Sequence, residues 1–180
     1  LGRSYDAVIR VNSQSGKGGA TFLLERGMGF TPTRRVQIEF SHAVQTLADA
    51  SGEEVTGDAI CALFAREFFE TDGPAARHGS GARWQNREIA AAPAAADATP
   101  EDAVRHLAAA FAAAAGTAID IASCEHARTT DGRIAVSVGC RVGDVPLRHG
   151  VGLHADAASA ALDAIVSAIN RSAWHCTDRR

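Results

Sequence analysis

Apolar residues fall at every second position near the beginning of the chain. Over residues 5–11 they alternate along the sequence, and a period of two predicts a half-buried strand. A cluster rich in glycine and serine occupies residues 13–19, and an apolar run resumes over residues 20–25. Because glycine clusters interrupt regular structure, the simplest prediction is a strand, a glycine loop and a second strand.

The next apolar residues recur at helical spacing in two segments. Thr31 offers a cap and Pro32 suits a first helical turn, and the pattern continues to Ser51. A second helix is predicted from Thr56, with Asp58 placed to favour the helix dipole. Each helix carries one apolar stripe, so both need a surface to pack against.

The composition changes between residues 71 and 98, where glycine, alanine and proline dominate. This shift predicts a domain boundary that holds one strand near Trp84. We place the junction near Gly73-Pro74. The expected organisation is a linker subdomain over residues 1–73 and a second domain over residues 74–180.

The second domain begins with a strong helix signal. Thr99 and Pro100 provide a cap and a first-turn proline, and the helix is expected to end at Gly116. Three strands and a final amphipathic helix are predicted over residues 118–124, 133–142, 145–153 and 156–171. The expected fold class is α+β, with a small strand and two-helix subdomain followed by an antiparallel sheet that has helices packed on one face.

The overall composition fits a globular protein. The chain has 180 residues, 46% of them hydrophobic, and a net charge of −3, which is enough apolar material for a packed core. Its apolar runs are shorter than the ~20 residues of a membrane helix, and no signal layout is present, so we expect a cytoplasmic protein without membrane contact. Its basic residues are scattered, which argues against a nucleic-acid partner.

The sequence shows no reaction centre. The seven histidines and four cysteines include no H-x-H, H-E-x-x-H or C-x-x-C spacing, so we expect reduced, mostly buried thiols and no metal site built by this chain alone. No serine lies in a G-x-S-x-G elbow, which argues against that class of hydrolase.

Gly16 and Lys17 invite comparison with a phosphate-binding loop. A Walker loop has a glycine where Val11 stands and a serine or threonine where Gly18 stands, so the pattern fails. A glycine loop that presents Lys17 and several backbone N–H groups could still contact an anion, such as a carboxylate or a coenzyme phosphate. The alternative is a plain connecting loop.

Two stretches carry distinctive motifs. The first runs from Ser4 through the glycine cluster to Gly19 and continues over residues 34–41; the second contains Glu125-His126-Ala127 and the Gly-Val-Gly-Leu and Ala-Ile-Val-Ser-Ala-Ile-Asn-Arg motifs within residues 150–171. In this order they resemble the linker and regulatory region of bacterial α-isopropylmalate synthases.

The resemblance implies that the chain is a piece of a longer enzyme, and a beginning at Leu1 fits that interpretation. The parent condenses acetyl-CoA with 2-oxoisovalerate in leucine biosynthesis, with a divalent metal in an amino-terminal (β/α)₈ barrel. This chain would lack the barrel, hold no cofactor and have no activity by itself. The family is homodimeric, and Tyr5 matches a linker tyrosine that acts at the partner's active site.

In this family leucine binds between two regulatory domains and lowers turnover. Four positions of this chain match those that line the effector: Ser123, Ala127, Ala155 and Ala157. The family's G-x-G-N-G-P loop is replaced here by residues 98–102, where Glu101 and Asp102 would repel a carboxylate at short range. The sequence therefore leaves leucine binding open.

Two other interpretations remain. The chain could be a free-standing effector-binding or dimerisation module, which a start codon just before Leu1 would indicate. It could also be the same region of a sibling acyltransferase of the citramalate or homocitrate synthase type. The keto-acid pocket of the barrel would distinguish these enzymes.

Overall fold

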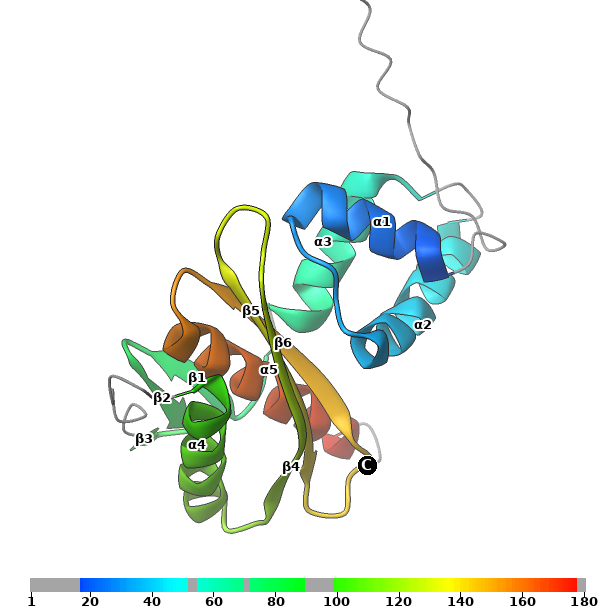
Figure 1. Ribbon diagram of the computed structural model, residues 1–180. Coiled ribbons are helices and arrows are strands. Elements are labelled where there is room, and N and C mark those ends of the chain that lie inside the picture. Colours follow the sequence, from blue (N-terminus) through cyan, green and yellow to red (C-terminus); the bar gives the residue numbers. More distant parts are fainter. Residues whose placement is uncertain (1–16, 52–54, 70–71, 90–98, 178–180) are drawn as a thin grey trace, which may run out of the picture. The chain divides into compact units, whose positions relative to one another are not determined.

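The computed structural model describes residues 17–51, 55–69, 72–89 and 99–177 (Figure 1). The chain divides into a first compact unit, Leu1–Phe64, and a second, Ala65–Arg180. This division falls inside helix α3, Gly57–Phe68. The domain junction predicted near Gly73-Pro74 from the shift in composition stays a prediction.

Three helices build the described part of the first unit: α1 (Lys17–Met28), α2 (Arg34–Ser51) and the larger part of α3. Phe64 of α3 is fully buried, and the rings of Phe30 and Phe40 meet it edge to face, with centroids 5.6 and 5.0 Å away. Such pairs stabilise a core beyond the area they bury. The two predicted helices are thus confirmed, and their apolar stripes pack around an aromatic cluster. The first helix begins at Arg34, so Thr31 and Pro32 precede it instead of forming its cap and first turn.

The strand predicted over residues 20–25 is wrong, because these residues belong to α1. Ala20, Leu23 and Leu24 are buried, and their separations of three and four place them on one helical face. So short a run does not reveal its period in the sequence. The other predicted strand, residues 5–11, lies outside the described residues.

The second unit repeats one arrangement, three antiparallel strands followed by a helix. The first copy consists of β1 (Ala75–His78), β2 (Gly81–Trp84), β3 (Arg87–Ile89) and α4 (Pro100–Ala115). The second copy consists of β4 (Ile119–Arg128), β5 (Ile134–Val142), β6 (Arg148–His154) and α5 (Ala157–Thr177). The single strand predicted near Trp84 is corrected to three. The strands and helices predicted beyond residue 99 are confirmed, and α5 continues past its predicted end at residue 171.

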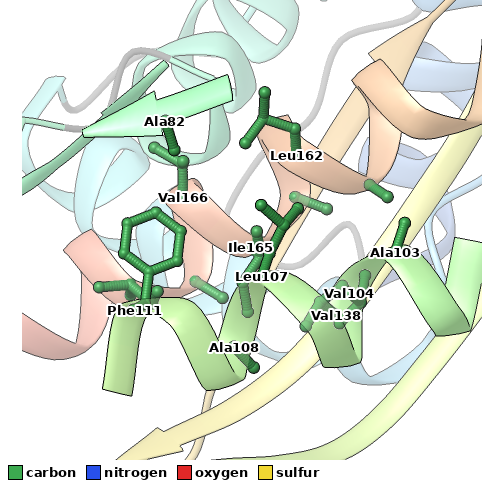
Figure 2. Close-up of a cluster of buried hydrophobic side chains, with 14 of the residues drawn as sticks. Ala82, Ala103, Val104, Leu107, Ala108, Phe111, Val138, Leu162, Ile165 and Val166 are labelled. Atoms are coloured by element: carbon green, nitrogen blue, oxygen red, sulfur yellow. The ribbon is translucent and has the colours of Figure 1, made fainter. Parts of the chain in front are cut away.

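Helices α4 and α5 lie between the two sheets of the second unit. The core that they share includes Ala82 of β2 on one side and Val138 of β5 on the other. Figure 2 shows Leu107 of α4 beside Ile165 of α5, with the ring of Phe111 in the same layer. The predicted antiparallel sheet with helices on one face is therefore confirmed for β4–β6. The β1–β3 sheet covers the opposite side of the helices.

Helix α4 begins and ends at the residues predicted. The Asp102 N–H donates to the Thr99 hydroxyl at 3.2 Å, and the Asp102 carboxylate accepts from the Thr99 N–H at 3.2 Å. This reciprocal pair is a capping box. At the other end Gly116, with φ of 67°, donates its N–H to Ala112 O at 2.9 Å, a left-handed cap that favours glycine.

Two glycines of β6 let α5 approach the sheet closely. A Cβ on Gly150 would overlap backbone atoms of Ala164 and Ala168, and a Cβ on Gly152 would overlap the backbone oxygen of Ala160. These three alanines are fully buried and follow one another at intervals of four along α5. The contact is therefore backbone against backbone, which requires glycine on the strand.

Asn170 attaches β1 to α5 from inside the core. Its side chain is 1% exposed. Its Oδ1 accepts from the Ala75 N–H at 3.0 Å, and its Nδ2 donates to the Ala75 carbonyl at 2.8 Å. One amide side chain therefore satisfies both backbone groups of Ala75, as a neighbouring strand would.

Candidate functional site

A β-bulge in β4 sets which side chains face away from the helices. Ile121 pairs with Cys140 and Ser123 pairs with Gly139, so Ala122 is the extra residue on β4. Ile121 and Cys140 pack toward the core of α4 and α5. The bulge therefore places Ser123 on the outer face of the sheet, where regular alternation would have turned it inward.

Ser123 lies in a small polar cluster formed by three strands. A Cβ on Gly139 of β5 would lie 2.6 Å from Ser123 Oγ and 2.9 Å from His149 Nε2 of β6. The missing side chain at Gly139 is what allows the two polar groups to approach. His149 is 6% exposed, so this part of the outer face is well covered.

The other effector candidates lie on β4 and around the start of α5. Ala127 shares the outer face of β4 with Ser123 and lies opposite Ala135. Ala155 lies just after the end of β6, and Ala157 is the first residue of α5. The structure therefore arranges the four predicted positions as two pairs, one on β4 and one at the start of α5.

Acidic side chains surround the start of α4. Hydrogen bonds from the side chain and backbone of Thr99 lower the pKa of Asp102. Glu101 Oε1 lies 3.4 Å from His126 Nδ1, whereas Glu125 lies opposite Ser137. Glu125 and His126 thus diverge, as adjacent residues of a strand should. A ligand carboxylate would meet two carboxylates at this helix start.

The start of α5 carries its own acid. Asp156 Oδ1 accepts from the Ser159 N–H at 2.8 Å, and Oδ2 lies 2.8 Å from His154 Nδ1. These contacts lower the pKa of Asp156, with the hydrogen bond from the Ser159 backbone as the largest cause and the His154 charge as a smaller one. Negative charge beside Ala155 and Ala157 favours a cationic ligand group there.

Removing the Asp156 cap is expected to destabilise the chain in a pH-dependent way. Asp156→Ala should lower the free energy of unfolding by about 1 kcal/mol at pH 7, the usual effect of losing an N-cap. Because the folded-state pKa is lowered, this contribution is present above the unfolded pKa of about 4 and is lost as pH falls through the folded pKa. Urea unfolding at pH 7 and at about pH 2.5 measures both values.

Asp156→Asn is the matched control for this cap, since it keeps an acceptor oxygen without the charge. Its deficit should be smaller than that of Asp156→Ala at pH 7 and should fall by the same amount as pH is lowered, because both variants lack the titrating carboxylate. An Asp156→Ala deficit that stays the same at both pH values would contradict the proposed contribution of the carboxylate.

Three cysteines have the properties of packed, unreactive side chains. Cys61, Cys124 and Cys140 are in the thiol form and not in disulfides. Burial, aided by the negative charge of Glu101, raises the pKa of Cys124 to about 11, and burial followed by the charge of Asp58 raises the pKa of Cys61. A protonated thiol is a poor nucleophile and a poor metal ligand.

Among residues 17–51, 55–69, 72–89 and 99–177, no three His, Cys, Asp or Glu side chains are grouped so that they could hold a metal ion. No helix in this part of the chain is long and apolar enough to cross a membrane.

Two predicted site residues belong to the beginning of the chain. Tyr5 lies outside the described residues. Lys17 was predicted in a glycine loop and is instead the first residue of α1, because the helix begins within the glycine cluster. Its proposed contact with an anion stays a prediction.

Comparison with known proteins identifies the relatives of this chain. A family described as "Alpha-isopropylmalate synthase, post-catalytic domain-like" matches residues 1–25. A 2-isopropylmalate synthase of Cupriavidus taiwanensis is 39% identical over 186 residues, which cover 95% of this chain and 32% of the relative. The chain is homologous to the 2-isopropylmalate synthases. The enzyme of Pseudomonas syringae pv. tomato is 37% identical over 96% of the chain and 32% of its own length, and that of Ralstonia nicotianae is 57% identical over 74 residues.

The chain thus corresponds to a C-terminal portion of 2-isopropylmalate synthases and spans 32% of the length of such relatives. This agrees with the family resemblance found in the sequence. The contacts of Asn170 with Ala75 and of Arg171 with Glu67 and Phe68 were not predicted from the sequence. The sequence offers a signal for them, because Asn170, Arg171 and Ser172 follow the largely apolar residues 160–169 of the same helix.

Proposed function

We propose that this chain is the linker and regulatory region of a cytoplasmic, homodimeric 2-isopropylmalate synthase, which serves dimerisation and leucine feedback without catalysis of its own. Similarity over 95% of the chain to enzymes of which it spans 32% carries the proposal. The match of a post-catalytic family to residues 1–25 supports a position that follows the catalytic region.

In the proposed parent enzyme, acetyl-CoA condenses with 2-oxoisovalerate in a barrel that precedes this chain. A divalent metal bound there would polarise the keto acid as a Lewis acid. The described residues of this chain contain no grouped ligand set for such an ion. The chain would therefore contribute to turnover by positioning the linker and the two protomers.

Leucine would act by binding one arrangement of the dimer better than another, since an effector shifts an equilibrium only by its difference in affinity. In one chain the candidate residues form two separate pairs, Ser123 with Ala127 and Ala155 with Ala157. A site between two copies would combine such surfaces. Asp156, which lies between Ala155 and Ala157, favours the ammonium group of leucine over its carboxylate at that pair.

Two measurements on the purified chain test the proposal. With acetyl-CoA, 2-oxoisovalerate and Mg²⁺, the chain alone should release no free coenzyme A above the blank. Light scattering at micromolar concentration should give twice the 18.7 kDa of one chain. Turnover by the isolated chain would contradict its non-catalytic role, and a strict monomer would remove the proposed interface.

Tyr5→Phe in the full-length enzyme should change turnover or its inhibition by leucine, because the resemblance assigns the hydroxyl a role at the partner's active site. A fall in kcat of roughly 10²-fold or more is expected if the hydroxyl transfers a proton. The free energy of unfolding, measured by thermal denaturation, should stay within about 0.5 kcal/mol of that of the unchanged enzyme. Unaltered kinetics with and without leucine would refute the role.

A further inference from the structure

Helix α5 is the central element of the second unit. It packs against β5 and β6, against α4, and against β1 and β2 of the other sheet. Its first residue, Ala157, is an effector candidate, and Asp156 caps it. Toward its other end, the side chain of Arg171 contacts the last turn of α3.

Arg171 makes three contacts with that turn. Its guanidinium carbon lies 4.0 Å from the centroid of the Phe68 ring. Its Nη1 donates to the Glu67 carbonyl at 2.5 Å and lies 3.5 Å from Glu67 Oε2. The Arg171 side chain is 15% exposed and Phe68 is fully buried, so little solvent screens these contacts.

The position of the Glu67 carbonyl explains why these contacts hold the helix. The last carbonyls of a helix have no partner within the helix, and a cation at this end complements the helix dipole. Arg171 supplies both a donor and a positive charge from α5. The end of α3 is therefore capped by a side chain 104 positions away in the sequence.

Helix α5 is held too closely by the β4–β6 sheet to bend locally. Gly150 and Gly152 place the strand backbone directly against the backbone of α5, and packed interiors transmit small displacements. A shift at the start of α5 would therefore carry Arg171 with it. Helix α3, which Arg171 contacts at its last turn, also contributes Leu63 and Phe64 to the core of the first unit.

We infer that Arg171 is a coupling residue that transmits the state of α5 to helix α3, and through α3 to the linker helices. This inference rests on the proposed function for its effector, leucine at the start of α5. The contact itself is independent of any ligand, so the two can be tested separately.

The test is hydrogen exchange of the full 180-residue chain, followed at the amides of residues 67–69 with and without leucine. Arg171→Met keeps an apolar stem and removes the charge, and Arg171→Lys keeps the charge without the planar donor fork. Arg77→Met is the matched control, because Arg77 also pairs with α5, through Asp163 at 2.8 Å, and does not belong to the α3 contact.

Without ligand, exchange at residues 67–69 should rise at least about tenfold in Arg171→Met, as expected for a local opening that the contact had opposed. Arg171→Lys should be intermediate and Arg77→Met unchanged. With saturating leucine, exchange at these amides should change in the unaltered chain. Arg171→Met should still bind leucine by calorimetry, but without that change.

A leucine response that persists in Arg171→Met, or ligand-free exchange equal to that of the unaltered chain, would overturn the inference. If the unaltered chain takes up no leucine, the proposed effector fails, and the ligand-free comparison alone decides whether Arg171 holds α3. If Arg171→Met loses its circular dichroism signal, Arg171→Lys provides the same comparison.

Discussion

Gly152→Ala is expected to abolish stable folding of the second unit. The new Cβ would overlap the backbone oxygen of Ala160, and a backbone atom inside a helix cannot rotate away as a side chain can. Overpacking of cores usually costs about 1–3 kcal/mol, and a clash with fixed backbone should exceed about 3 kcal/mol. Gly150→Ala should behave in the same way, since it meets Ala164 and Ala168. Urea unfolding followed by circular dichroism measures the loss.

Gly18→Ala is the matched control for these substitutions. Gly18 lies in α1, and a Cβ there would meet nothing within 4 Å. Alanine should therefore leave stability unchanged or raise it by up to about 1 kcal/mol through helix propensity. If Gly152→Ala unfolded at the same urea concentration as the unaltered chain, the close packing of α5 on β6 would be wrong.

Asn170→Leu is expected to detach β1 from α5. The substitution leaves the buried N–H and carbonyl of Ala75 without their partners at 3.0 and 2.8 Å. Each buried group left unsatisfied costs about 1–3 kcal/mol, so the loss of both should be about 2–6 kcal/mol. Leucine keeps the number and branching of the side-chain heavy atoms, so it removes the hydrogen bonds without leaving a cavity. Denaturant unfolding gives the total, and hydrogen exchange at β1 locates it.

Arg77→Met is the comparison for Asn170, because Arg77 joins the same two elements at the surface. Its pair with Asp163 has side chains that are 34% and 32% exposed, and such pairs contribute only about 0–1 kcal/mol. Asn170→Leu should therefore cost several times more than Arg77→Met. Equal effects would indicate that β1 is held by something other than the Asn170 amide.

The ends of helices and the longer strands of the second unit could be predicted because their signals are local. Thr99 and Asp102 satisfy each other at the start of α4, and Gly116 adopts the left-handed conformation at its end. The strands after Gly116 have ten, nine and seven residues, which is long enough to reveal the period of a strand. Here sequence and structure agree.

Helix α1 and strands β1–β3 could not be predicted for the opposite reason. The apolar run at residues 20–25 spans less than two helical turns, so strand and helix periods fit it equally well, and packing against the other helices decides. Strands of three or four residues, such as Arg87–Ile89, carry no alternation to detect. Their existence depends on the helix surface that they cover.

The residues of the candidate site could be predicted from the sequence, but their arrangement could not. Ser123, Ala127, Ala155 and Ala157 came from family resemblance. The bulge at Ala122 places Ser123 on the same face of β4 as Ala127, and the path of β6 into α5 places Ala155 beside Ala157. Both are features of the folded sheet. The contact of Arg171 with Phe68 joins residues far apart in the chain and required the structure.

The central claim is that this chain is a leucine-responsive regulatory region, and isothermal titration of leucine into the purified chain tests it most directly. The account predicts a saturable heat with a dissociation constant below about 1 mM, or roughly −4 kcal/mol, at concentrations where light scattering shows a dimer. It also predicts weaker binding of 4-methylpentanoate, which lacks the ammonium group that Asp156 would attract. No heat at millimolar leucine from a folded, dimeric chain would contradict the claim.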